Sequence, residues 1–87
     1  MENLGREIKN NDIWKHFKGN IIRIVEASAF NTETTEECVV YKELSQNKIW
    51  VRPKAMFLEE VDHIKYPNVE QQYRFVKISE AKSNRKE

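Results

Sequence analysis

Three β-type segments follow one another closely between residues 21 and 52, and they restrict the chain to a mainly-β fold. Residues 21–30 are rich in Ile and Val at both alternating positions, a pattern typical of a strand covered on both faces or of a strand with a bend. Residues 37–44 and 49–52 predict two further strands, and the short polar link between them predicts a hairpin. Pro53 ends the third strand because proline cannot donate to a strand ladder.

Shorter segments on both sides complete the predicted architecture. Residues 13–17 predict a first strand that ends at a turn around Gly19. Residues 53–57 predict one helical turn, since proline suits the first helical position. Residues 57–61 predict a resumed strand, whereas residues 73–78 fit a strand or a helix, with alternation favouring the strand. About five short strands with one short helical turn before the last favour a small open barrel.

The chain length allows one domain with a limited core. An 87-residue chain buries only about 60–65% of the surface that its unfolded form exposes. We expect a flexible N-terminal arm over residues 1–12, the barrel over residues 13–78 and a charged C-terminal tail over residues 79–87. With only two glycines, the turns are expected to use asparagine, which tolerates left-handed backbone.

Charge and cysteine content narrow the possible settings. Fifteen Lys and Arg face fourteen Asp and Glu, so the net charge of +1 is not the basic footprint expected of a nucleic-acid-binding domain. No apolar run approaches the roughly 20 residues that a membrane helix needs, so no membrane partner is expected. Cys38 is the only cysteine and cannot form an internal disulfide, which favours a cytoplasmic protein.

Three motifs carry a family resemblance: HFKG at residues 16–19, EECVVYK at 36–42, and WVRP at 50–53 followed by MFLEEV at 56–61. In this order they resemble the small bacterial family catalogued as domain of unknown function sixteen-fifty-three. The resemblance covers roughly residues 13–62, with Arg74-Phe75 as a closing element. It implies an SH3-like barrel and no assigned biochemical activity.

The chain departs from the family pattern in two places. Members usually carry a histidine where Asn31 stands, and a Tyr-Gly pair near the hairpin at residues 45–48. If that histidine is catalytic or a metal ligand in relatives, this chain lacks the corresponding activity.

The residues that usually carry catalysis or bind metals are few and poorly spaced. His16, His63 and Cys38 do not have the close spacing of a zinc site. Cys38 lies in an apolar strand, where burial makes a thiol inert. No glycine-rich loop is present to hold phosphates. We therefore predict no catalytic residue, no metal and no cofactor, and lean against an enzyme.

The aromatic and basic residues of the predicted hairpin offer a recognition surface. Tyr41 lies on one face of its strand, and Trp50 and Arg52 share a face of the next. Outward aromatics beside an arginine are typical of recognition surfaces. With His16 nearby, these residues are the predicted binding site.

The alternating pattern leaves the orientation of this surface open. In one arrangement Ile49 and Val51 fill the core with Cys38, Val40 and Leu44, which leaves the aromatic face outward. In the other, the helical turn or the C-terminal segment with Phe75 covers the aromatic face as a small core.

Three functions are compatible with these features. The first is a non-catalytic binding module whose aromatic and arginine surface takes a peptide or protein partner. The second is RNA or single-stranded DNA binding, since small barrels do this with stacking aromatics and a basic groove. The third is an accessory subunit of an enzyme, in which a dimer interface completes a shared active site. The oligomeric state is not predicted.

Overall fold

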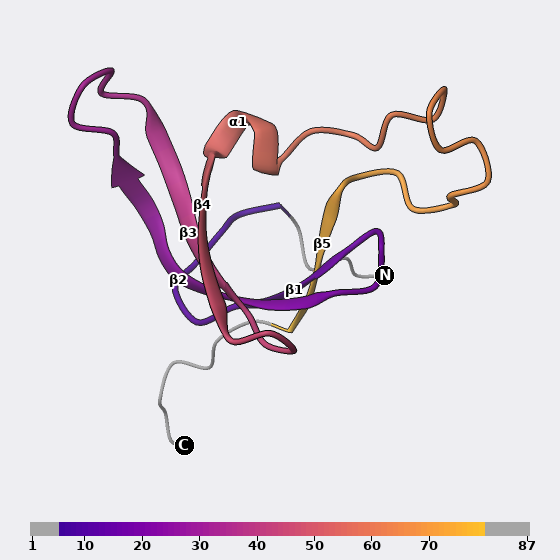
Figure 1. Cartoon of the computed structure of the whole chain (residues 1–87), viewed down its shortest axis with the longest axis horizontal. Coiled ribbons are helices and arrows are strands. Elements are labelled where there is room, and N and C mark those ends of the chain that lie inside the picture. The colour runs from indigo at the N-terminus through magenta and orange to yellow at the C-terminus, as the bar shows by residue number, and fades with distance from the viewer. Residues whose placement is uncertain (1–5, 80–87) are drawn as a thin grey trace.

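A computed structural model, which describes residues 6–79, shows a single five-stranded antiparallel sheet (Figure 1). The strands are β1 (Ile13–His16), β2 (Ile21–Phe30), β3 (Glu37–Glu43), β4 (Lys48–Pro53) and β5 (Phe75–Ser79), with the short helix α1 (Lys54–Phe57) after β4. Their order in the sheet is β4-β3-β2-β1-β5. Because β4 and β5 do not pair, the sheet stays open, as an open barrel of about five strands with one helical turn predicts.

The turns use asparagine as the sequence predicts, and the long strand β2 is irregular. Asn11 and Asn47 have positive φ angles of 74° and 60°, so asparagine does take left-handed turn positions here. Gly19, with φ of 102°, closes the β1–β2 turn. The pairing of β2 with β3 shifts register twice, between Ile24 and Glu26 and again before Ala29. Such bulges bend a long strand and increase its twist, which accounts for the mixed apolar pattern of residues 21–30.

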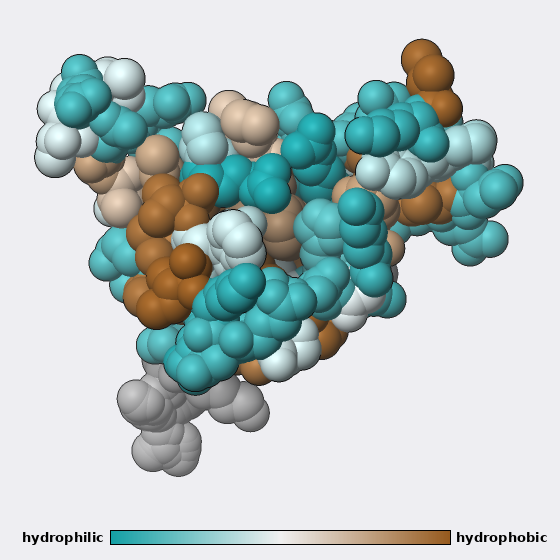
Figure 2. All heavy atoms as spheres, viewed as in Figure 1, coloured by the Kyte–Doolittle hydropathy of each residue, from teal (hydrophilic) through white to brown (hydrophobic). Residues whose placement is uncertain are grey.

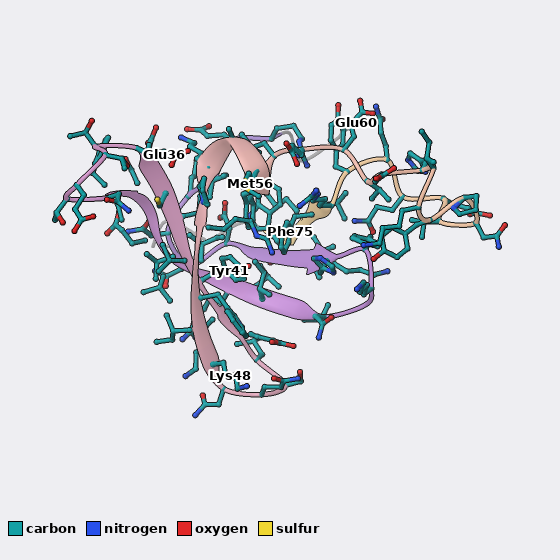
Figure 3. All side chains as sticks on the ribbon, turned by 45° about the horizontal axis from the view of Figure 1, so that its top comes forward. Glu36, Tyr41, Lys48, Met56, Glu60 and Phe75 are labelled. Atoms are coloured by element: carbon teal, nitrogen blue, oxygen red, sulfur yellow. The ribbon has the colours of Figure 1, made fainter. Side chains whose placement is uncertain are left out.

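The core is a cluster of aromatic rings under α1 and β5. Phe57 of α1 stacks on Phe75 of β5 with ring centroids 4.2 Å apart. Trp14 of β1 meets Phe57 edge-on at 5.2 Å, and Tyr41 of β3 contacts both phenylalanines at 5.7 and 5.6 Å. Figure 3 shows Tyr41 and Phe75 together in the middle of the molecule. Ring pairs at these distances add packing energy beyond their burial.

The sheet buries its aromatic face, so one of the two predicted orientations is wrong. Ile49 and Val51, expected in the core, are 60% and 65% exposed, and Leu44 is also exposed. Tyr41 is only 6% exposed, because α1 and β5 cover it as the second arrangement predicts. Aromatic rings fill more volume than Val or Ile, so a small core gains more by enclosing them. Figure 2 shows an apolar surface patch on the side where β4 runs.

Cys38 and Val40, which the same wrong orientation placed in the core, are less exposed than Ile49 and Val51. Cys38 is buried, as expected, and its Sγ lies 3.6 Å from the carbonyl oxygen of Glu36. Val40 is half-buried on the outer face, opposite Val51 of β4.

Residues 57–61 do not form the predicted strand. Only an isolated bridge joins Glu60 to Tyr73, and Val61 donates its backbone N–H to the Gln72 carbonyl oxygen at 2.8 Å. The chain then leaves this partner for a long connection over residues 62–72, so no ladder can extend. For residues 75–78 the strand alternative is confirmed, since they belong to β5 and pair with β1, whereas Tyr73 and Arg74 precede the strand.

The described part of the predicted N-terminal arm packs against the sheet. Ile8 is buried in the core, and Arg6 donates to the backbone carbonyl oxygens of Phe75 and Leu58. Asp12 forms an ion pair with Lys77 of β5, with 3.4 Å between Oδ2 and Nζ and both side chains fully buried. Residues 6–12 therefore belong to the packed domain, because a buried charge pair and a core isoleucine fix them. Residues 1–5 and 80–87 lie outside the described part, so the predicted tail is not described beyond Ser79.

Within residues 6–79, no helix is both long and apolar enough to cross a bilayer.

Candidate functional site

A concave pocket of about 200 Å³ opens on the inner face of the sheet, and every strand contributes to it. His16 comes from β1, Ile22 from β2, Tyr41 from β3, Trp50 from β4 and Phe75 from β5. We call this site the aromatic pocket. It exists because the open sheet curves around the core without β4 and β5 closing on each other.

All four residues predicted as a binding site line this pocket. Tyr41 and Trp50 are direct cross-strand partners in the β3–β4 ladder, and Arg52 lies two residues further along β4. His16 reaches the same space from β1 and meets the Phe75 ring at 4.8 Å. Tyr41 belongs mainly to the core, whereas Trp50 is 45% exposed. Trp50 therefore presents ring surface to the open pocket, and Tyr41 supports the pocket from below.

Hydrogen bonds hold the polar side chains of the pocket in place. Arg52 Nε donates to the Tyr41 hydroxyl oxygen at 3.2 Å. Trp50 Nε1 donates to Glu43 Oε1 at 3.3 Å, and the Asn20 amide donates to Glu43 Oε2. A carboxylate offers about four acceptor positions, so Glu43 retains capacity to accept from a ligand. The pocket thus combines fixed aromatic walls with an acceptor and a cation.

His16 is neutral in the folded protein near pH 7. Burial lowers the pKa of His16 below its usual 6.5, and the nearby cations Arg52, Lys18 and Arg74 lower it further. His16 Nδ1 accepts a hydrogen bond from the Lys18 backbone N–H at 3.1 Å. The proton of the neutral ring is therefore assigned to Nε2, which makes it a hydrogen-bond donor.

A second pocket of about 270 Å³ adjoins the first and shares His16 and Arg52 with it. We call it the basic pocket because three further cations, Lys18, Lys65 and Arg74, also line it. Its carboxylate is Asp62, whose Oδ1 accepts backbone N–H groups of the connecting loop at 3.1 and 3.2 Å.

Two more aromatic rings form a wall of the basic pocket. Phe17 and Tyr66 meet edge-on with centroids 5.0 Å apart. The ammonium groups of Lys18 and Lys65 each lie 5.5 Å from the centre of the Tyr66 ring. The basic pocket therefore offers positive charge beside an aromatic surface.

The two pockets differ in what their side chains can do chemically from a nucleophile or metal centre. Neither pocket contains a serine, threonine or cysteine, so neither holds a hydroxyl or thiol nucleophile of that kind. Among residues 6–79, no three His, Cys, Asp or Glu side chains gather in a way that could hold a metal ion. What the two pockets do offer is flat ring surface, fixed hydrogen-bonding groups and a concentration of cations.

Sequence reasoning missed several residues of the two pockets. Glu43 was detectable, because it shares the face of Tyr41 by strict alternation along β3. Lys65 and Tyr66 were not, because the connection that carries them has no periodic pattern to place it. His63 is exposed on this connection and lines neither pocket.

Comparison with known proteins identifies one family. No curated protein matches the chain, and no solved structure matches it. The family described as "Protein of unknown function (DUF1653)" matches residues 12–77, a span that runs from the buried Asp12 to its ion-pair partner Lys77 and includes both pockets. The chain therefore belongs to the DUF1653 family of proteins of unknown function.

Proposed function

We propose that this protein is a small non-catalytic binding module and that the aromatic pocket is its recognition site. The observation that carries the proposal is the convergence of His16, Tyr41, Trp50 and Arg52, from three strands, on one concave surface. Half-exposed tryptophan beside arginine is the composition of binding hot spots, because both give large contact area with directional polar groups. Trp50 is 45% exposed and supplies that surface.

The charges in and around the pocket favour an anionic partner. Arg52 already lies over the Phe75 ring, with 5.7 Å between its guanidinium carbon and the ring centre. A cationic ligand would have to displace this internal cation, whereas a carboxylate or phosphate would add to it. The pocket accordingly suits a peptide or protein partner, the class placed first by the sequence, and the charges specify an acidic segment with an aromatic side chain. It also suits the flat bases of a single nucleic-acid strand.

Amide-resolved NMR tests the proposal with both probes. The labelled protein is titrated with a ten-residue peptide of alternating Glu and Tyr, and separately with a mixed-sequence ten-nucleotide single strand at low salt. We expect at least one probe to shift the resonances of His16, Trp50 and Arg52 in a saturable way. The Trp50 indole N–H is a specific reporter, because Trp14 is fully buried and should not respond.

A matched pair of arginine variants separates recognition from general charge attraction. Arg52→Gln removes a cation from the aromatic pocket, while Arg23→Gln removes one from the opposite face of β2, between the inward-facing Ile22 and Ile24. Arg52→Gln should weaken binding about tenfold, and Arg23→Gln should leave it within about twofold, since a charge-assisted hydrogen bond contributes about 1.5–3 kcal/mol. Equal effects of the two variants, or no shifts with either probe, would refute the proposed function.

We infer that this binding takes place in the cytoplasm. The support is the lone Cys38, which is buried and free. A domain of this size in an oxidising compartment would usually carry disulfides.

A further inference from the structure

The two adjoining pockets point to one class of partner. We propose that the protein binds single-stranded nucleic acid, with a base in the aromatic pocket and the adjacent backbone phosphate in the basic pocket. This assignment rests on the proposed function above and names its partner. It is carried by the shared wall of the two pockets, which Arg52 and His16 form together.

The basic pocket has cations that are available to a phosphate. Lys18, Lys65 and Arg52 form no ion pair within residues 6–79, whereas Arg74 is engaged by Glu59 at 3.1 Å. Asp62, the carboxylate of this pocket, accepts two backbone N–H groups of the connecting loop at its Oδ1, and these hydrogen bonds partly neutralise its negative charge. Three cations without carboxylate partners around one concave site favour a phosphate, whose oxygens accept several charge-assisted hydrogen bonds at once.

The aromatic pocket has the polar groups that a base edge requires. Glu43 accepts from Trp50 and Asn20 and keeps further acceptor capacity, and His16 Nε2 is assigned as a donor. A base carries donors and acceptors on its edge and a π-face for stacking on Trp50. A phenylalanine side chain would satisfy neither polar group, so the pocket favours a base over an apolar peptide anchor.

The order of groups along the surface also matches a nucleic-acid strand. Trp50 lies in the aromatic pocket, the shared cation Arg52 comes next, and the Phe17–Tyr66 ring pair with its two lysines lies beyond. Rings that alternate with cations correspond to the base–phosphate–base sequence of a single strand. The site is therefore expected to span two or three nucleotides.

The net charge of +1 does not oppose this assignment, because the charges are unevenly distributed: five of the eight residues that line the basic pocket are His, Lys or Arg and one is acidic. Glu33 and Glu36 lie in the β2–β3 connection and Glu37 begins β3, and Figure 1 shows this connection at the opposite end of the molecule from the chain between α1 and β5. In Figure 3, Glu36 is likewise well removed from Phe75, which lines the aromatic pocket. The net charge is therefore close to zero although the molecule has a basic pocket, and part of its negative charge lies far away at the β2–β3 connection.

Fluorescence anisotropy of a labelled ten-nucleotide single-stranded RNA, with the same DNA sequence in parallel, tests the assignment on the full chain. Lys18→Gln together with Lys65→Gln should weaken binding at least about tenfold. The matched control, Arg23→Gln together with Lys42→Gln, removes two cations from the opposite face of the sheet, where these residues are cross-strand partners. It should leave affinity within about twofold. With one or two phosphates neutralised, as a site of two or three nucleotides implies, the slope of log K against log salt should lie between about −0.7 and about −1.4.

The stacking contact has its own variant. Trp50→Ala should weaken binding about fivefold or more, and Trp50→Phe should restore most of the affinity, since every aromatic face can stack on a base. Far-UV circular dichroism of each variant shows whether it is folded. If Trp50→Ala is unfolded, Trp50→Phe against Trp50→Leu gives the same comparison.

The possible outcomes separate this inference from the proposed function. Saturable binding of the single strand, with loss only in the pocket variants, supports both. Binding of the Glu-Tyr peptide without the single strand would leave the binding module standing and overturn the nucleic-acid assignment. Two further anisotropy competitors, the duplex of the same sequence and heparin, test for diffuse charge attraction. If they compete as well as the unlabelled single strand does, the nucleic-acid assignment is also overturned. If neither peptide nor single strand binds, both proposals are wrong.

Discussion

Truncation of Tyr41 to alanine should destabilise the protein strongly, because this residue, whose orientation the sequence left open, is part of the core. The side chain is 6% exposed and contacts Phe57 and Phe75. An aromatic residue buries roughly 150–250 Å², and at about 25 cal/mol per Å² this is about 4–6 kcal/mol. Compact unfolded chains lower such values, and aromatic truncations in cores cost about 3–5 kcal/mol. We therefore expect Tyr41→Ala to lower the free energy of unfolding by about 3–5 kcal/mol.

Such a loss is a large part of the total for a chain of this size. At roughly 0.05–0.15 kcal/mol per residue, 87 residues give about 4–13 kcal/mol. Urea unfolding, followed by circular dichroism and by tryptophan fluorescence, measures the change with the buried Trp14 as core reporter. The two probes should report the same midpoint if unfolding is two-state.

Two companion variants divide the effect into its parts. Tyr41→Phe keeps the ring and removes only the hydroxyl that accepts from Arg52, so it should cost about 0.5–1.5 kcal/mol. Val51→Ala, at a position 65% exposed on the other face, should change stability by at most about 0.5 kcal/mol. A decrease in the free energy of unfolding below about 1 kcal/mol for Tyr41→Ala would refute the assignment of the aromatic face to the core. A decrease for Val51→Ala that exceeds the one for Tyr41→Ala would refute it as well.

Three further predictions concern the Asp12–Lys77 ion pair, the His16 imidazole and the Cys38 thiol. Asp12→Ala leaves Lys77 buried without this carboxylate and should lower the free energy of unfolding, measured in urea, by about 3–5 kcal/mol. The double variant Asp12→Leu with Lys77→Met should recover most of this loss. A loss below about 1 kcal/mol in Asp12→Ala would contradict the buried pair. Burial and neighbouring cations lower the folded-state pKa of His16, so the unfolded chain binds the proton more tightly. Stability should therefore be fully present above about pH 6.5 and fall as the pH drops toward the folded-state pKa, and His16→Gln should reduce this slope; an unchanged slope would exclude His16 as its source. Cys38 should react with a thiol reagent far more slowly in the native protein than in urea, and equal rates would show that its burial is incomplete.

Local pattern was sufficient for most of the secondary structure. Strand alternation and turn residues placed the β2–β3–β4 meander, the helical turn after Pro53 and the strand character of residues 75–78. The same alternation placed Tyr41, Trp50 and Arg52 together, because residues two apart in a strand share a face and hairpin partners are adjacent. The strand predicted over residues 57–61 is wrong because local pattern does not show whether a partner strand is present. A strand needs a partner ladder, and the chain diverges from the one available at Tyr73.

The sequence by itself determined which side chains share a face, and the tertiary structure alone decided which face is buried. Alternation shows which residues of one strand share a face, but it does not show which elements pack on that face. From the sequence, Val51 and Trp50 were therefore equivalent candidates for the core. The decision came from Phe57 and Phe75, which reach the Tyr41 face from α1 and β5 and enclose the larger rings there. The basic pocket likewise exists only in the folded chain. Lys18 and Lys65, far apart in sequence, meet at the Tyr66 ring because β1 and the connection before β5 are brought side by side by the β1–β5 pairing.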